Sequence, residues 1–251
     1  MGRNTALTDL GTIDRAMVVF AHPDDAESWA GGTVAVLVRR GCEVTYVVVT
    51  NGDKGSSDRT MSPERLSIIR RQEQCAAATI LGVRHVEFLD YADCEVEDTY
   101  ALRREVTRQI RRFRPGLVIT HDPRRTYDVG LSHRDHRIVG AVALDCVYPL
   151  APSPMAFPEL SLECDPHRVS EVYLMQSAAP RLFVDISATI ELKGRALACH
   201  ASQMGEPAAV ASAVRARAAS LGERCGAPYA EGFRRVSEIG ERVGEGPASP
   251  R

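Results

Sequence analysis

Short valine-rich runs alternate with longer segments of helical periodicity along most of this 251-residue chain. The first two runs are MVVFA (17–21) and EVTYVVVT (43–50), and a helical segment follows each of them, the second after a loop. This alternation is typical of a mostly parallel sheet with helices on both faces. We therefore predict a single α/β domain built on a Rossmann-like sheet.

The same signals predict the remaining elements. Ser62 followed by Pro63 marks the start of a helix, and Gly82 marks its end. An arginine-rich segment near 102–113 has apolar residues at helical spacing, so its arginines are expected on a solvated helix face. Strands are expected at 85–89, 116–121, 171–176 and 181–186, and helices at 29–40, 63–81, 132–147, 187–201 and 207–222.

Composition sets the limits of the domain and of its partners. Hydrophobic residues make up 44% of the chain, which is enough for one sizeable core. We predict one domain over 1–243, a proline-rich insertion or lid at 148–166, and a flexible tail at 244–251. The formal net charge of −2 argues against nucleic acid or an anionic membrane as partner.

The cysteines and the apolar runs predict the compartment. The 7 cysteines are widely spaced, and a disulfide framework is not expected. No run reaches the ~18 apolar residues of a membrane span, and the N-terminal segment lacks a signal-peptide core. We therefore expect a cytoplasmic protein.

Histidines and acids gather in the loops that follow the strands. The first strand leads into AHPDDAE (21–27), the second into TNGDKGSSD (50–58) and the third into DYADCE (90–95). The fourth strand leads into HDPRRTYDVGLSHRDH (121–136). Because the ligand site of such sheets lies outside the carboxyl ends of the strands, we expect these loops to line one crevice.

The first and fourth loops contain the residue types of a catalytic metal site. His22 and Asp25 are three residues apart, as are His133 and His136. One histidine and one carboxylate from the first loop, with one histidine from the fourth, would make a His₂Asp site. Three protein ligands with an open fourth position are typical of catalytic zinc. No cysteine is expected near these loops, so a thiolate site is not predicted.

The acid and the histidine left outside this ligand set suit hydrolysis. Asp24 can take a proton from the attacking water. His133 can stabilise an oxyanion and protonate a leaving amine, and Asp135 can orient its ring. A metal ion, a general base and a general acid are together the catalytic groups of amide hydrolysis. Each motif alone could instead be a helix cap beside a surface histidine, but two such loops at strand ends favour a site.

A nucleotide-binding site is the rival interpretation of a strand followed by a helix in this kind of sheet. The Gly-rich fingerprint of that site is absent after the first strand, where only Gly31 and Gly32 are adjacent. Acidic residues also stand where a phosphate would bind. The sequence therefore does not support nucleotide binding.

Together these motifs resemble the PIG-L/LmbE-like de-N-acetylases, zinc enzymes that remove acetyl groups from N-acetylglucosaminyl compounds. AHPDDAE and HRDH (133–136) carry the resemblance, which continues through RRQEQCAAATILGV (70–83), KGRALACHASQ (193–203) and YAEGFRR (229–235). It covers nearly the whole chain. Length and the segment from 132 to 152 look most like the subgroup that acts on N-acetylglucosamine and diacetylchitobiose.

The resemblance implies a role for each residue of the two motifs. His22, Asp25 and His136 would hold one zinc ion per chain. Asp24 would be the general base, and His133 the acid that stabilises the intermediate.

It also implies residues around them. Asp135 would orient His133, and Arg70 would contact the sugar. We expect Arg125 and Tyr127, with Asp122 of the HDP segment, to contribute to substrate binding.

The substrate class stays open between related reactions. The main hypothesis is deacetylation of an N-acetylglucosamine-type sugar, either free, in a chito-oligosaccharide or in a natural-product glycoside. The alternatives are a thiol-conjugate amidase, an inositol-linked N-acetylglucosamine deacetylase and a non-catalytic sugar-binding protein. Relatives acting on inositol-linked sugars carry a tyrosine where this chain has Leu131, so a tyrosine contribution would come from elsewhere. The resemblance also makes a homo-oligomer plausible.

Overall fold

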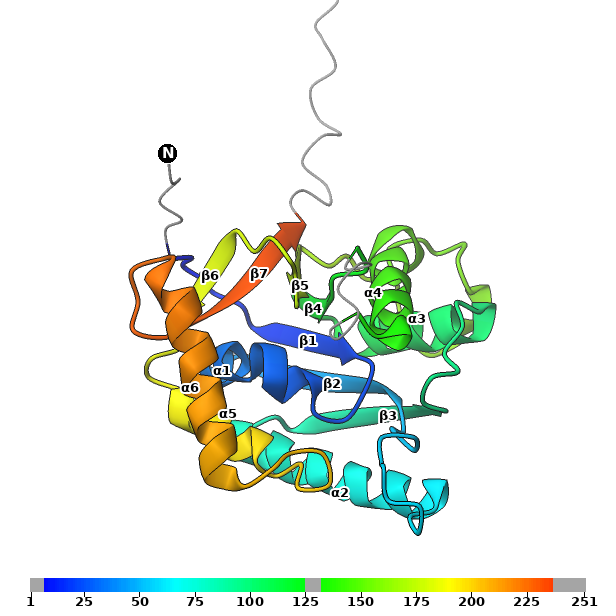
Figure 1. The fold of residues 1–251 in the computed structure, drawn as a ribbon. Coiled ribbons are helices and arrows are strands. Elements are labelled where there is room, and N and C mark those ends of the chain that lie inside the picture. The colour runs from blue at the N-terminus through cyan, green and yellow to red at the C-terminus, as the bar shows by residue number, and fades with distance from the viewer. Residues whose placement is uncertain (1–6, 125–131, 237–251) are drawn as a thin grey trace, which may run out of the picture.

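The structure is a computed structural model that describes residues 7–124 and 132–236. Seven strands form one sheet in the order β3-β2-β1-β4-β5-β7-β6 (Figure 1). Neighbouring strands from β3 to β5 pair in parallel, whereas β7 is antiparallel to both β5 and β6. The predicted α/β class with a mostly parallel sheet is confirmed. The strands are β1 (Arg15–Phe20), β2 (Glu43–Thr50), β3 (His85–Tyr91), β4 (Leu117–His121), β5 (Glu171–Met175), β6 (Leu182–Asp185) and β7 (Ala230–Val236).

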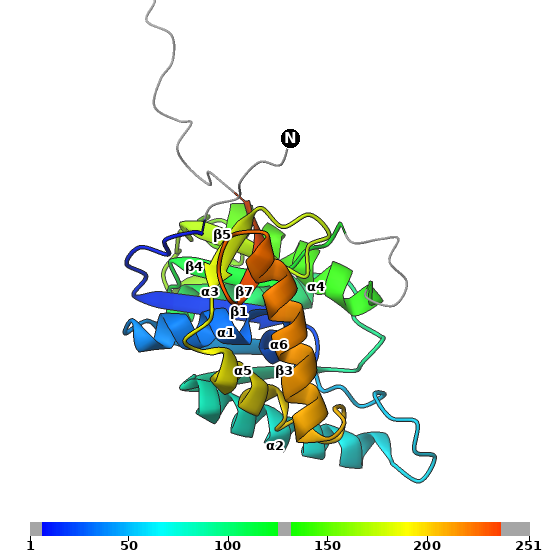
Figure 2. The same cartoon turned by 60° about the vertical axis from the view of Figure 1, so that its left-hand side comes forward.

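Helices cover both faces of this sheet and bury one apolar cluster on each side. Helices α1, α2, α5 and α6 lie on one face, and α3 and α4 lie on the other (Figures 1 and 2). Among the described residues, no helix combines the length and apolar character needed to cross a bilayer. The helices are α1 (Asp25–Arg39), α2 (Pro63–Leu81), α3 (Tyr100–Phe113), α4 (Arg134–Asp145), α5 (Ile190–Leu197) and α6 (Pro207–Glu223), with short turns η1 (Cys146–Leu150) and η2 (Pro158–Leu162).

Local sequence signals set the bounds of α2 as predicted. The Ser62 hydroxyl accepts a hydrogen bond from the Arg65 N–H at 3.2 Å, and Pro63 occupies the first turn. Gly82 ends the helix with a φ of 79°, a left-handed conformation that glycine adopts without steric cost.

Two predicted bounds and one missing strand need correction. Helix α1 begins at Asp25 rather than near Trp29, so the second acid of HPDD lies in its first turn. The helix expected to reach residue 147 ends at Asp145 and continues as η1. Strand β7 was not predicted, because its sequence AEGFRRV has few of the β-branched residues that marked the other strands.

The arginine-rich helix also differs from the expectation. Arg111 is not on a solvated face: it is 1% exposed, and its guanidinium donates to the carbonyls of Leu150, Ala151, Ser153 and Ala156. Through these hydrogen bonds, α3 binds part of the proline-rich segment at 148–166. Its role as an insertion or lid stays a prediction, and the tail at 244–251 lies outside the described residues.

The strand order positions the functional loops. It reverses between the neighbours β1 and β4: the chain leaving β1 enters α1 on one face, and the chain leaving β4 leads to α4 on the other. Such a reversal leaves a crevice at the carboxyl ends of the two strands. The loops after β1 and β4, which carry the two histidine motifs, meet there.

The crossing of α4 over the end of β4 predicts an effect on stability. A Cβ at Gly140 would overlap the carbonyl oxygen of His121. This oxygen belongs to the backbone, which cannot move away as a flexible side chain could. We expect Gly140→Ala to lower the free energy of unfolding by about 1–3 kcal/mol, measured by urea denaturation. Gly194→Ala in α5 is the matched control, because its Cβ would meet nothing nearer than 3.8 Å. Equal losses in the two variants would contradict this account of the crossing.

Candidate active site

Three side chains from the two loops converge at the crevice. The Nδ1 atom of His22 lies 3.1 Å from Nε2 of His136 and 3.3 Å from Oδ2 of Asp25. Oδ1 of Asp25 lies 3.1 Å from the same His136 nitrogen. His22 comes from the turn after β1, and Asp25 and His136 from the first turns of α1 and α4. All three ligand atoms lie within 4.8 Å of one another.

This geometry suits a tetrahedral metal ion. Zinc binds imidazole nitrogen and carboxylate oxygen at about 2.0–2.1 Å, which places tetrahedral ligand atoms about 3.3 Å apart. The two histidine nitrogens lie 3.1 Å apart, and each lies 3.1–3.3 Å from a different oxygen of Asp25, so the spacing is close to that value. Two imidazole nitrogens that face each other beside a carboxylate are also the donor set that zinc prefers.

Gln176 fixes the orientation of His136. Its Oε1 accepts from Nδ1 of His136 at 2.9 Å and from Nδ1 of His121 at 3.3 Å. Donation from Nδ1 leaves the lone pair of His136 on Nε2, which faces Asp25. The Nε2 of His121 accepts the Ala21 N–H at 3.1 Å, so its Nδ1 carries the proton. Sequence reasoning missed Gln176; the available signal was its place at the carboxyl end of a predicted strand.

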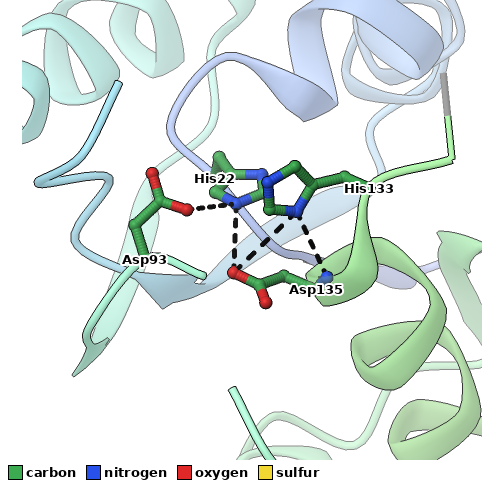
Figure 3. A group of neighbouring side chains, drawn as sticks. All are labelled: His22, Asp93, His133 and Asp135. Carbon is green, nitrogen blue, oxygen red and sulfur yellow. Dashed lines mark hydrogen bonds and ion pairs between the residues drawn. The ribbon is translucent and has the colours of Figure 1, made fainter. Parts of the chain in front are cut away.

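The other ring nitrogen of His22 faces two acids, one from the loop after β3 and one from the first turn of α4 (Figure 3). Nε2 lies 3.1 Å from Oδ1 of Asp93 and 3.4 Å from Oδ2 of Asp135. Burial lowers the pKa of His22, but hydrogen bonds with Asp135, Asp25 and Asp93 together raise it well above its ordinary value. Carboxylates that hold one ring nitrogen turn the other toward the metal position.

Asp135 thus has a different place from the one expected. Its Oδ2 lies 4.0 Å from Nδ1 of His133, nearer to His22, and accepts the Cys94 N–H at 2.8 Å. The backbone N–H of Asp135 donates to Nδ1 of His133 at 3.2 Å. The main chain of Asp135 therefore orients His133, while its carboxylate supports His22.

His133 is the N-cap of α4, which determines its tautomer. Because Nδ1 accepts a backbone N–H, a neutral His133 carries its proton on Nε2. Burial lowers the pKa of His133, the charge of His22 lowers it further, and Asp135 opposes both. The residue therefore favours a neutral ring with an Nε2–H donor.

The expectation that no cysteine lies near these loops is wrong. The Cys94 sulfur lies 3.6 Å from Nε2 of His133 and 3.4 Å from Oδ1 of Asp93. Cys94 belongs to DYADCE, the loop after β3, which the parallel sheet brings to the same edge as the two histidine motifs. Its position in a loop that follows a predicted strand was the sequence signal that could have placed Cys94 near the site.

Asp24 lies in the turn between β1 and α1 with a φ of 110°, which is unusual for a non-glycine residue. Its N–H donates to Oε1 of Gln74 at 3.1 Å, and its Oδ2 accepts from Arg70 at 3.1 Å. Burial, followed by the charge of Asp25, raises the pKa of Asp24 to about 7, although Arg70 opposes the shift. A carboxylate with such a pKa can accept and release a proton near neutral pH.

A buried polar chain supports this turn from behind. Gln74 donates to Glu27 at 3.1 Å, and the other Glu27 oxygen lies 3.2 Å from Nε2 of His200. All three side chains are buried. The turn therefore rests on hydrogen-bonded groups that come from α1, α2 and the loop after α5.

These residues open into a pocket of about 410 Å³. Arg70 reaches its wall, but its guanidinium also donates to the carbonyls of Pro23 and Gly52, so it ties two loops together. Asp122 is buried and its carboxylate accepts the Arg124 N–H at 3.0 Å; it is not part of the wall formed by described residues. Arg125 and Tyr127 lie outside the described residues. The wall is formed by His22, Asp24, Asp25, Ser28, Trp29, Gly55, Arg70, Asp93, His133, His136, Gln176 and Arg217.

Comparison with known proteins supports the reading of the motifs. A family profile described as GlcNAc-PI de-N-acetylase (PIG-L) matches residues 17–147, which is more than half of the chain. The diacetylchitobiose deacetylase of Thermococcus kodakarensis is 33% identical over 229 residues, 90% of this chain and 85% of that protein. The chain belongs to the PIG-L family.

Solved structures show how far this PIG-L fold extends. The N,N'-diacetylchitobiose deacetylase of Pyrococcus horikoshii superposes with a TM-score of 0.84 at 31% identity, covering 94% of this chain and 91% of that chain. The 4-carboxy-2-hydroxymuconate hydratase of Pseudomonas putida has a TM-score of 0.77 at 25% identity, covering 94% and 100%. The second case shows that the fold alone does not determine the reaction.

The role of Gln176 can be tested through metal affinity. Gln176→Leu removes the acceptor that orients His136, and losing such a support costs about 10–100-fold in metal affinity. We expect that loss for zinc in competition with a chelator. Ser177→Ala, at the next position, is the control and should bind zinc as the native chain does. An unchanged zinc affinity in Gln176→Leu would contradict this role.

Proposed function

We propose that this PIG-L protein is a metal-dependent hydrolase that removes the acetyl group from an N-acetylglucosamine-type amino sugar, releasing acetate and the free amine. The observation that carries the proposal is the convergence of His22, Asp25 and His136 between Asp24 and His133 in one pocket. The similarity to diacetylchitobiose deacetylase over 90% of the chain supports it.

We assign one zinc ion per chain to His22, Asp25 and His136. When bound there, zinc supplies Lewis acidity, which polarises the acetamide carbonyl and activates water. The support is the match between the ligand separations and tetrahedral geometry. The buried Asp25 carboxylate contributes the negative charge that offsets part of the charge of the ion.

Asp24 acts as the general base. Arg70 binds Oδ2 of Asp24, which leaves Oδ1 to take the proton from the attacking water. The hydrogen bond between the Asp24 N–H and Gln74 holds the turn that presents this carboxylate. The raised pKa keeps the proton transferable, so Asp24 can pass it on as the C–N bond breaks.

His133 faces the same pocket with an Nε2–H donor. That donor can hydrogen-bond the oxygen that gains negative charge when water adds to the acetamide carbon. Because Nδ1 accepts the Asp135 N–H and Nε2 lies 3.6 Å from the Cys94 sulfur, the ring keeps this orientation before the substrate binds. In this scheme His133 stabilises the intermediate, and the proton needed by the leaving nitrogen comes from Asp24.

The substrate is proposed to be a sugar of the diacetylchitobiose class, with natural-product glycosides, inositol-linked N-acetylglucosamine and thiol conjugates as alternatives. Arg70, Arg125, Tyr127 and Asp122 stay predicted substrate-binding residues. A homo-oligomer and a cytoplasmic location also stay predictions. All 7 cysteines are free in the structure, as a reducing compartment would require.

A panel of substrates tests this function directly. Zinc-loaded protein is mixed with N-acetylglucosamine, diacetylchitobiose, an inositol-linked N-acetylglucosamine and a thiol conjugate, and released primary amine is measured. We expect release from the acetylated glucosamine compounds that a chelator abolishes and zinc restores. Sugar binding without turnover on any compound would favour the non-catalytic alternative.

The base assignment has its own test. Asp24→Asn keeps the shape of the side chain but cannot accept the proton, so we expect turnover to fall by about 10²–10⁴-fold. Zinc content should stay at one per chain. Loss of zinc from this variant would mean that Asp24 and Asp25 have exchanged roles, and near-native turnover would remove Asp24 as the base.

A further inference from the structure

A buried ion pair lies against the backbone of helix α1. The ammonium of Lys193 on α5 donates to the carbonyl of Ser28 at 2.9 Å. The Glu231 carboxylate on β7 accepts the N–H groups of Gly32 at 2.9 Å and of Thr33 at 2.7 Å. The two charged groups are 2.5 Å apart, and the residues are only 4% and 3% exposed. The pair therefore holds α1 through its main chain rather than through its side chains.

These contacts engage two backbone groups that are normally partners of each other. In a regular α-helix, the Gly32 N–H would donate to the Ser28 carbonyl, four residues earlier. Here the Ser28 carbonyl accepts from Lys193, and the Gly32 N–H donates to Glu231. A group that inserts into this ladder of hydrogen bonds is a known cause of bending in helices. The direction of the turn that precedes Ser28 therefore depends on the ion pair.

Gly32 is also the point where α1 approaches the segment between β6 and α5. A Cβ at Gly32 would lie 2.7–2.8 Å from side-chain atoms of Ile186, so this approach requires glycine. The Gly32 carbonyl accepts the Thr189 hydroxyl at 2.9 Å. Both backbone polar groups of Gly32 thus have side-chain partners outside α1, and the helix is fixed at this position.

We propose that Lys193 and Glu231 are positioning residues of the metal site. Their ion pair sets the direction of the first turn of α1, and with it the places of Asp24 and Asp25. The catalytic consequence rests on the proposed function, in which Asp25 is a zinc ligand and Asp24 the base. Ser28 lines the pocket beside these acids, whereas Lys193 and Glu231 are not part of the wall formed by described residues. The pair therefore acts through the backbone of α1 rather than by contact with the substrate.

Small movements of this turn are enough to matter. Catalytic and metal-binding groups must be held within about 0.5 Å of their productive geometry. A misplacement of about 1 Å can cost about 10²-fold in rate. An ion pair that only stabilised the fold would change the free energy of unfolding, but would leave the zinc affinity of the folded chain unchanged. Zinc affinity therefore separates the two roles.

The experiment removes both charges together in Lys193→Met/Glu231→Leu. No unpaired charge is left in the core, and replacing a buried ion pair by apolar residues of similar volume is often neutral for stability. We expect a folded chain whose zinc affinity, measured by competition with a chelator, falls by about 10–100-fold. At saturating zinc, kcat should also fall by about 10–100-fold, whereas KM should change far less because neither residue is placed in the pocket wall.

The matched control is Glu191→Gln/Arg215→Gln, which removes another ion pair of α5, 2.6 Å apart and exposed, that joins α5 to α6. It should keep the native zinc affinity and kcat. Native values in the folded Lys193→Met/Glu231→Leu variant would overturn the proposal. If that variant does not fold, Glu231→Gln decides, because its amide has one oxygen for two N–H groups. We expect a smaller loss of zinc affinity there, and a native affinity would equally overturn the proposal.

Hydrogen exchange of the zinc-free chains gives a readout that depends neither on zinc nor on turnover. We expect the amides of residues 25–33 to exchange faster in Lys193→Met/Glu231→Leu than in the native chain, with residues 34–39 unchanged. Native exchange rates in residues 25–33 would overturn the proposal. A native chain that neither binds zinc nor releases amine would contradict the proposed function instead, and the exchange rates would still decide whether the pair positions this turn.

Discussion

The Asp25 carboxylate contacts imidazole rings that come from three segments of the chain. Its oxygens lie 3.3 Å from Nδ1 of His22, 3.1 Å from Nε2 of His136 and 3.4 Å from Nε2 of His121. Oδ2 also accepts the His22 N–H at 2.7 Å. Burial of a lone carboxylate would be costly, and the hydrogen bond from the His22 N–H offsets part of that cost. The turn after β1, the end of β4 and the start of α4 are therefore held at one point.

The pKa values of the two adjacent acids, Asp24 and Asp25, shift in opposite directions. Burial raises the pKa of Asp25, but His136 and His121 outweigh it and hold the pKa well below its ordinary value. Burial and then the charge of Asp25 raise the pKa of Asp24 to about 7, and Arg70, His200 and His22 only partly oppose the shift. In the proposed reaction, this separation of pKa values would let Asp25 serve as ligand and Asp24 as base. Both carboxylates line the pocket, and the difference comes from the charges beside them: histidines beside Asp25, and the Asp25 carboxylate beside Asp24.

The loop after β3 adds the part of the site that most distinguishes it from a simple three-ligand centre. Asp93 and Cys94 reach the histidine motifs because β3 runs parallel to β1 and β4, so the carboxyl ends of the three strands lie on the same side of the sheet. Lys54 anchors this loop through the Asp93 carbonyl at 2.5 Å, and the Asp53 carboxylate accepts the Asp93 N–H at 3.0 Å. The loop after β2 thus positions the loop after β3. The hydratase with a similar fold shows that this fold alone does not determine the reaction.

The strand–helix alternation, the bounds of α2 and the two motifs could be predicted from the sequence, because each rests on residues within one short segment. The motifs and the family resemblance together also named His22, Asp25 and His136, which the structure brings together as a candidate metal site. The contact of Gln176 with His136, the turn of Asp135 toward His22 and the approach of Cys94 to His133 appear only in the folded chain. Each of these contacts joins residues 39–113 positions apart, or depends on which way a side chain turns once the strands have paired. A local sequence pattern does not show which distant residues will meet, because these contacts form only when the strands pack into the sheet.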